Sequence, residues 1–287
     1  MSDDRIDVRK TYKLYVGGAF PRSESGRSYP VHGPKGALLA HAAQASRKDV
    51  RDAVVAARSA FGKWSTATAY NRGQILYRVA EMLEGRRAQF VDEVLASEKT
   101  TPRRAAAQVD AAVDRFVHYA GWSDKFAQVV GSTNPVAGPY FTFSLPEPTG
   151  VVAVLAPQDS SLLGLVSVVA PVLATGNTCV VVASQEHPLP AVVLAEVLAT
   201  SDLPGGVVNL LTGYTAELAP WLASHRDVNA IDLTGAAPEM RAALQGAAAG
   251  NVKRTYVPRS TDWTAEPGLS RLLAFTETKT VWHPIGV

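Results

Sequence analysis

The sequence VVAVLAPQDSSLLGLVSVVAPVLATGNTCVVV, residues 151–182, decides the fold. It begins with an apolar run of strand length, continues through a helical segment that ends at Gly176, and finishes with a second apolar run. Both short runs are apolar almost throughout, which is typical of parallel strands whose sheet is covered on both faces. This order predicts two parallel strands joined by a crossover helix.

The same alternation continues towards the C-terminus. The segments PAVVLAEVLATS, AELAPWLAS and PEMRAALQGAAAG have helical character, and VVNLLTG, VNAIDLTG and NVKRTYV between them have strand character. Five strands alternating with four helices predict an α/β fold with a doubly wound, mainly parallel, Rossmann-like sheet and helices on both faces. A ligand of such a sheet binds beyond the carboxyl ends of the strands.

The residues before Val151 are predicted to form short strands, then helices, then a hairpin. Residues 11–45 predict short strands joined by Gly and Pro turns, and helical spacing starts at Ser46 and resumes at Ile75 and Phe90. Pro102 can open a further helix, because proline is tolerated in a first turn. Residues 131–150, GSTNPVAGPYFTFSLPEPTG, alternate bulky with small or polar side chains between prolines, which predicts a hairpin arm.

Composition excludes several classes of function. The chain has 287 residues, 47% of them hydrophobic, and its 28 basic and 26 acidic side chains give a net charge of +2. This balance offers no electrostatic case for nucleic acid. The charged N-terminus lacks the apolar core of a signal peptide, and no apolar run reaches the roughly 20 residues that span a bilayer. With Cys179 as its only cysteine, we expect a cytoplasmic protein without membrane contact.

Polar residues at the predicted strand ends are the candidate site. Asp159 is a possible acid or base, Glu186 can accept hydrogen bonds from ribose, and the Thr234-Gly235 turn can hold a phosphate through backbone N–H groups. Structural roles compete with the first two of these, namely Ser160 next to Asp159 as a helix cap and Glu186 in a solvated loop, and a lone Thr-Gly turn is a weak signal. Cys179 falls within a strand and is expected in the core.

Several familiar signatures do not occur in the sequence. It contains no GxGxxG, no Walker motif and no GxSxG, and its six histidines show no spacing typical of a metal site. The residues taken alone therefore predict the shape of a nucleotide-binding domain without specifying a reaction.

A family resemblance adds to this. The runs EPTGVVAVLAP, APVLATGNTCVVVASQEHPLPAVVLAEVL, LPGGVVNLLTG and VNAIDLTG together resemble the cofactor-binding domain of NAD(P)-dependent aldehyde dehydrogenases. The N-terminal segments resemble the same family's strands and helices, GPYFTFSLPEPTG its oligomerisation hairpin, and LAFTETKTVWHP its C-terminal strand. The resemblance covers residues from about 11 to 260 and from about 268 to 284. It implies a cofactor-binding domain at 1–130 and 151–260, and an oligomerisation arm and tail at 131–150 and 268–287.

The resemblance implies a weakened cofactor site. It assigns cofactor binding to Glu186, Gly213, Thr234 and Gly235. The family's ribose-binding lysine falls at Ala183, its pyrophosphate-binding hydroxyl at Ala236, and its helical glycine at Met240. Each lost polar contact costs about 1–3 kcal/mol, so NAD or NADP is expected to bind weakly or not at all.

The catalytic residues that the resemblance implies are missing as well. Gln158-Asp159 stands where the family has an oxyanion-binding asparagine, and Pro258 stands where it has the general-base glutamate. After residues 257–275, VPRSTDWTAEPGLSRLLAF, the chain passes directly to the tail, which implies that the catalytic domain with its cysteine nucleophile is absent. No catalytic or metal-binding residue is therefore assigned, and catalysis by this chain is not expected.

These features favour a non-catalytic subunit that associates, through its arm and tail, with a full-length aldehyde dehydrogenase. Unpaired strand edges are a liability unless a partner covers them, and strand addition would cover them. The alternatives are a stand-alone NAD(P)-binding module, a structural homo-oligomer, and an enzyme of another kind in which Asp159 acts as a base.

Overall fold

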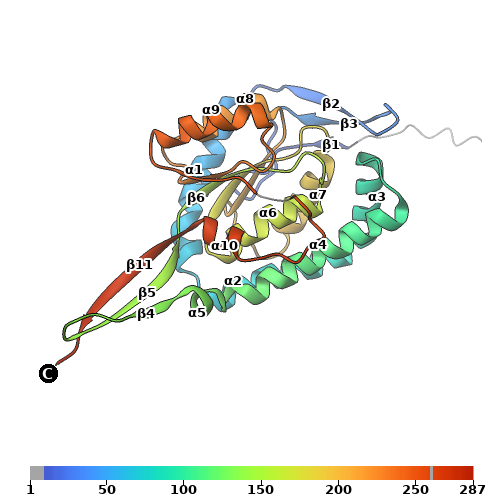
Figure 1. Cartoon of the computed structure of the whole chain (residues 1–287). Coiled ribbons are helices and arrows are strands. Elements are labelled where there is room, and N and C mark those ends of the chain that lie inside the picture. The colour runs from blue at the N-terminus through green and yellow to red at the C-terminus, as the bar shows by residue number, and fades with distance from the viewer. Residues whose placement is uncertain (1–9, 259–260, 287) are drawn as a thin grey trace, which may run out of the picture.

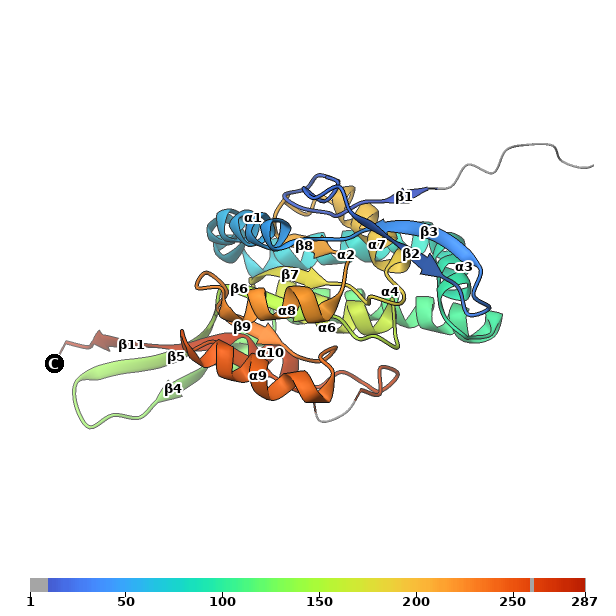
Figure 2. The ribbon, with the colours of Figure 1, turned by 90° about the horizontal axis from the view of Figure 1, so that it is seen from above.

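A five-stranded parallel sheet forms the centre of the molecule. The computed structural model describes residues 10–258 and 261–286. The strands are β6 (Val151–Leu155), β7 (Thr178–Val182), β8 (Val208–Leu211), β9 (Ala230–Asp232) and β10 (Arg254–Tyr256). They lie in the order β10-β9-β6-β7-β8, so the chain starts in the middle, winds outward to β8, and returns to the other side of β6. Figure 1 shows the whole chain, and Figure 2 labels β8, β7, β6 and β9 in this order. The doubly wound α/β prediction is confirmed.

Helices cover both faces of this sheet because the side chains of its strands alternate between two cores. One core contains Val152, Val154 and Val181 and packs against α2 (Ala69–Gly85), α4 (Pro102–Ser123), α6 (Leu163–Ala174) and α7 (Leu189–Ala199). The other contains Val151, Val180 and Ile231 and packs against α1 (Arg47–Thr66), α8 (Thr215–Ser224) and α9 (Pro238–Ala249). Figure 1 shows the two helical layers, with α8 and α9 on one side of the sheet and α2 and α4 on the other.

The N-terminal region has the predicted short strands and helices. β1 (Thr11–Tyr12), β3 (Leu38–Ala43) and β2 (Ser28–His32) form a small sheet in that order. Ser46 caps α1, since its hydroxyl accepts hydrogen bonds from the backbone of Lys48 and Asp49. After α2, the short α3 (Arg87–Ser97) leads into α4, which opens with Pro102 as expected.

A three-stranded antiparallel arm projects from the body (Figures 1 and 2). After the short helix α5 (Phe126–Val130), β4 (Ser132–Asn134) and β5 (Tyr140–Pro148) form the predicted hairpin. β11 (Thr276–Pro284) pairs with the whole length of β5, from Thr276 opposite Pro148 to Pro284 opposite Tyr140. β5 is therefore the central strand, and β4 and β11 are the two edges.

Residues 257–275, which we call the joint, connect β10 to β11, and described residues of the joint between 261 and 275 pack against the body. They include the short helix α10 (Ser270–Ala274), whose Leu272 is buried in the core together with Phe275. Arg115 of α4 donates hydrogen bonds to the backbone carbonyls of Trp263 (2.7 Å) and Ala265 (3.2 Å). Part of the predicted tail thus belongs to the core of the body, while the division into domain, arm and tail stays a prediction. In the described part of the chain, no helix is both long and apolar enough to cross a bilayer.

Candidate functional site

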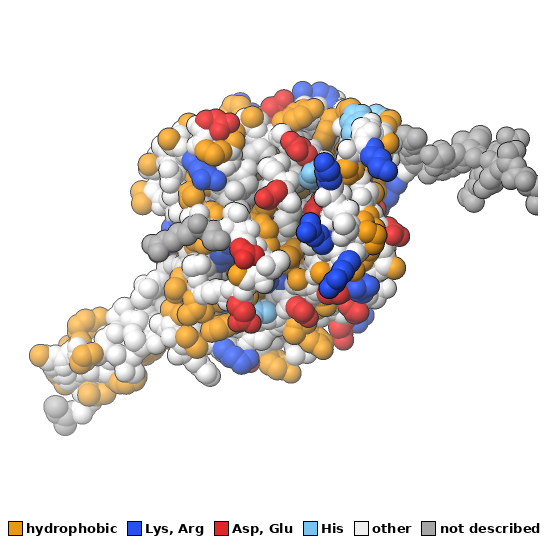
Figure 3. Space-filling view, turned by 45° about the vertical axis from the view of Figure 1, so that its right-hand side comes forward, with side chains coloured by type: hydrophobic (Ala, Val, Ile, Leu, Met, Phe, Trp, Pro, Cys, Tyr) orange, Lys and Arg blue, Asp and Glu red, His pale blue; other side chains and the backbone are white. Residues whose placement is uncertain are grey.

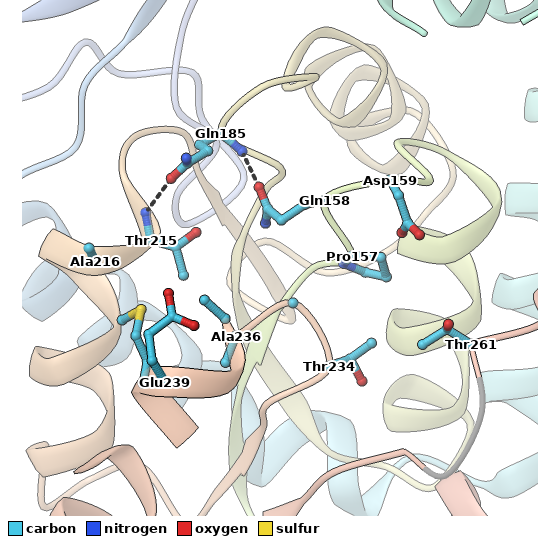
Figure 4. A pocket seen from close by; sticks show the side chains of 13 residues that line it. Pro157, Gln158, Asp159, Gln185, Thr215, Ala216, Thr234, Ala236, Glu239 and Thr261 are labelled. Atoms are coloured by element: carbon cyan, nitrogen blue, oxygen red, sulfur yellow. Dashed lines mark hydrogen bonds between the residues drawn. The ribbon is translucent and has the colours of Figure 1, made fainter. Parts of the chain in front are cut away.

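A cavity of about 420 Å³ lies beyond the carboxyl ends of the parallel strands, at the point where the winding of the sheet reverses between β6 and β9. This is where ligands of doubly wound sheets bind. Its described lining comes from the segments that follow β6, β7 and β9, and from the first turns of α8 and α9 (Figure 4). The fold therefore brings predicted strand-end segments together around one cavity.

Thr234 and Gly235 line this cavity, but both are engaged in holding the fold. The carboxylate of Asp232, at the end of β9, accepts hydrogen bonds from the backbone N–H of Thr234 (2.9 Å) and from its hydroxyl. The same hydroxyl oxygen accepts a hydrogen bond from Arg271 of α10 at 3.0 Å. The Thr234 side chain is thus occupied by protein partners.

Gly235 is required by close packing of two backbones. A Cβ atom at this position would lie 1.9 Å from the carbonyl oxygen of Ala156 at the end of β6. The Gly235 N–H donates to the carbonyl of Leu155 at 2.8 Å. Glycine is therefore needed at this position for backbone packing, whether or not a ligand binds.

A chain of amide hydrogen bonds crosses the strand ends (Figure 4). Gln158, after β6, donates to the carbonyl of Ala156 at 2.9 Å and accepts a bond from the backbone N–H of Gln185 at 3.0 Å. Gln185, after β7, in turn accepts a bond from the backbone N–H of Thr215 at 3.3 Å. Both glutamine side chains thereby connect loops that follow β6, β7 and β8 at the cavity wall.

The cavity carries negative rather than positive side-chain charge. Asp159 and Glu239 line it from opposite sides (Figure 4), and the described lining residues include no lysine or arginine. The first turn of α9 has no side-chain cap, so its backbone N–H groups are the positive end that remains for an anion. A dinucleotide pyrophosphate would meet two carboxylates here without a cationic side chain from the described wall.

Glu186 and Gly213 lie apart from Thr234 and Gly235. Glu186 is exposed and lines a neighbouring hollow of about 340 Å³, together with Tyr29, His187 and Tyr214. Gly213 has a φ of +143° and packs against the backbone of Ala45. The structure thus brings two of the four predicted cofactor-binding residues to the main cavity, and their role in binding stays a prediction.

The other candidates have structural explanations. The N-cap of α6 is Leu162, and Ser160 lies two residues before it; the Ser160 hydroxyl accepts a hydrogen bond from Gly164 N–H (2.9 Å) in the first turn, so it is engaged by the helix start without being the N-cap. Cys179 is fully buried in β7, and burial raises the pKa of its thiol far above the usual range. Among the described residues, no group of three His, Cys, Asp or Glu side chains is arranged to hold a metal ion.

Comparison with known proteins decides the family. The family model described as "Aldehyde dehydrogenase family" matches residues 20–258. The chain belongs to the aldehyde dehydrogenase family. It is 34% identical over 245 residues to the mitochondrial aldehyde dehydrogenase family 2 member B4 of Arabidopsis thaliana, covering 84% of this chain and 45% of that protein. It is 33% identical over 254 residues to retinal dehydrogenase 2 of Homo sapiens, covering 87% and 48%.

Solved structures share this fold. HpcC from Thermus thermophilus superposes with a TM-score of 0.82 at 30% identity, over 86% of this chain and 48% of that chain. The NAD⁺ complex of aldehyde dehydrogenase from Bacillus cereus gives 0.81 at 26% identity, over 86% and 50%. The chain thus spans about half the length of the aldehyde dehydrogenases it matches.

Two of the three positions where a cofactor contact of the family is expected to be lost lie at the cavity. Ala236 and Met240 line it, and Ala183 is fully buried after β7. Sequence reasoning missed Glu239, Gln185 and the Asp232–Arg271 contact. Glu239 is next to Met240, and Gln185 is next to Glu186. Because the carboxyl ends of parallel strands meet at one edge of the sheet, this position in the sequence could have identified both. The contact with Arg271 had no signal in the sequence, because it joins positions 39 residues apart.

Proposed function

We propose that this chain is a non-catalytic, aldehyde dehydrogenase-like subunit that docks through its arm onto a full-length aldehyde dehydrogenase in the cytoplasm. The arm carries the proposal: β5 is paired on both sides, while β4 and β11 are edge strands with open backbone groups. Edge strands pair readily with a further strand, and strand addition is a common mode of protein recognition.

The arm also presents apolar side chains to solvent. Phe141 is 49% and Trp282 58% exposed, and Tyr140, Leu145 and Ile285 on the arm are exposed as well. The Tyr140 and Trp282 rings meet edge to face, 5.7 Å apart. Figure 3 shows hydrophobic side chains gathered towards the end of the arm. Exposed apolar groups next to open strand edges support a protein partner.

The cavity supports a non-catalytic role for this chain. Its described lining contains no thiol, and the only cysteine of the sequence is buried in β7. A thiolate nucleophile requires an accessible, deprotonated sulfur, which Cys179 does not offer. The only thiol of the sequence is therefore not available for a covalent adduct with an aldehyde, and NAD(P) binding is proposed to be weak.

The experiment is an affinity purification of the tagged chain from its native host, followed by native mass spectrometry. We expect a stoichiometric aldehyde dehydrogenase, lost in the Phe141→Glu, Trp282→Glu variant because two charges disrupt the arm surface. The control is Val55→Glu, which changes an exposed apolar residue of α1 and should retain the partner.

Other outcomes would decide between the alternatives. Recovery of the chain alone as a defined oligomer, dissociated by the same arm variant, would replace the partner with a structural homo-oligomer. A monomer that binds NAD⁺ or NADP⁺ at micromolar concentration in calorimetry would instead make the chain a stand-alone nucleotide-binding module.

A further inference from the structure

We propose that a small polar cavity under the joint binds a small monovalent anion beside Arg115. The cavity has a volume of about 100 Å³ and is separate from the site at the strand ends. Its walls come from α4, α6, β10, the joint and α10, and the described lining contains both buried arginines, Arg115 and Arg271.

The first observation is a buried positive charge without a counter-ion. Arg115 is only 9% exposed; it donates hydrogen bonds to the carbonyls of Trp263 and Ala265 and also interacts with the side chain of Tyr119, none of which is charged. Within the described residues it forms no ion pair with a carboxylate, whereas Arg271 in the same cavity pairs with Asp232. A buried charge is costly unless it is paired.

The second observation is a pair of buried donors without acceptors. Ser167, in the middle of α6, is 2% exposed, and its hydroxyl has no hydrogen-bond partner among the described residues. The same holds for the indole N–H of Trp263, which can only donate. Both side chains line the cavity next to Arg115. Buried polar atoms are nearly always satisfied, so an acceptor is expected between them.

Size and charge define the class of ligand. One water molecule occupies roughly 30 Å³ of liquid, so this cavity holds only a few heavy atoms. A halide, formate or acetate fits that limit. The carboxylates of Asp262 and Glu266 are exposed and also line the cavity; they repel any anion there in proportion to its charge, so ions with more than one negative charge are disfavoured most.

Such an anion would bridge three parts of the fold. It would accept hydrogen bonds from α4 through Arg115, from α6 through Ser167, and from the joint through Trp263. Charge-assisted hydrogen bonds of this kind are about twice as strong as neutral ones. Binding would therefore fasten the joint onto the two helices and raise the stability of the folded chain.

The test is thermal unfolding of the full chain in sodium formate or sodium bromide at constant ionic strength, balanced with the larger gluconate ion. We expect a saturable rise in Tm in formate and bromide. Arg115→Gln should abolish the rise, and Ser167→Ala should weaken anion binding about tenfold because one donor is lost. Arg103→Gln, on the exposed start of α4, should respond like the unmodified chain.

A bromide-soaked crystal supplies the direct readout. An anomalous peak within hydrogen-bonding distance of the Arg115 guanidinium is expected. The proposal is overturned if Tm does not respond, if Ser167→Ala responds in full, or if the Glu266 carboxylate occupies the site instead. Glu266→Gln separates these explanations: it should strengthen anion binding under the proposal, and should destabilise the anion-free chain if Glu266 is the counter-ion.

Discussion

The Arg271 guanidinium of α10 forms a buried ion pair with the Asp232 carboxylate at the end of β9. Asp232 is fully buried, and the Arg271 guanidinium also lies over the ring of Tyr256, 4.9 Å from its centroid. This pair connects the joint to the turn that carries Thr234 and Gly235. The strand end at the candidate site is therefore held by a residue from the segment that leads to the arm.

Removal of one partner of this pair should be strongly destabilising. Asp232→Asn leaves the Arg271 charge buried without its counter-ion, and we expect a loss of about 3–5 kcal/mol in the free energy of unfolding. The double variant Asp232→Asn, Arg271→Met should recover part of that loss, since it buries no charge. Urea unfolding at neutral pH measures both, and a single variant within about 1 kcal/mol of the unmodified chain would contradict the expectation.

Gly235 at the cavity and Gly246 in α9 should respond in opposite directions to substitution by alanine. Gly235→Ala forces a methyl group against the Ala156 carbonyl, so it should lower stability by at least about 1–3 kcal/mol. Gly246→Ala in α9 has open space around the new methyl group and should stabilise by up to about 1 kcal/mol. Equal effects of the two substitutions in urea unfolding would show that the close approach at Gly235 is unimportant.

Lys253 should make the free energy of unfolding depend on pH in the alkaline range. Burial lowers the pKa of its ammonium group from 10.5 to about 8. Between pH 8 and 10.5 the unfolded chain therefore binds more protons at this residue, and the free energy of unfolding should rise with pH across that window. Lys253→Met should reduce this rise and raise stability at pH 7. A slope that is identical in the variant and the unmodified chain, measured by urea unfolding at several pH values, would exclude Lys253 as its source.

Returning the residue types of the family to positions 236 and 240 should recover cofactor binding. Ala236→Ser returns a hydroxyl to the start of α9, and Met240→Gly removes a side chain from the cavity lining. We expect the double variant to bind NAD⁺ at least about tenfold more tightly than the unmodified chain in calorimetry, from contacts of about 1–3 kcal/mol each. Ala249→Ser, at the exposed end of α9, serves as the control and should change nothing. Unchanged affinity in the double variant would mean that NAD⁺ does not bind in this cavity.

Sequence patterns predicted the parallel sheet well because its strands are buried on both faces. Val151–Leu155 and Thr178–Val182 are buried at every position, so their uninterrupted apolar runs identify them without tertiary information. The arm was also predictable, since the alternation around Tyr140 is the normal pattern of a strand with one face exposed.

The contacts of the joint could not be predicted from the sequence. α10 spans only Ser270–Ala274, which is too short for a helical period to be recognised. Arg115 lies in an amphipathic helix, where a charged residue normally faces solvent, and nothing local shows that the joint covers it. The backbone N–H groups of the Thr234-Gly235 turn were predicted for phosphate, whereas in the structure the N–H of Thr234 donates to Asp232 and that of Gly235 donates to the carbonyl of Leu155.

The pairing of β11 with β5 also sets an order of events during synthesis on the ribosome. The hydroxyls of Ser144 and Thr280 share a hydrogen bond of 2.8 Å, yet they are 136 positions apart. The nascent chain therefore exposes β5, with β4 as its only neighbour, until the whole parallel sheet has been translated. Unpaired strands of this kind are what chaperones shield, so a nascent chain stalled before Thr276 is expected to be their client.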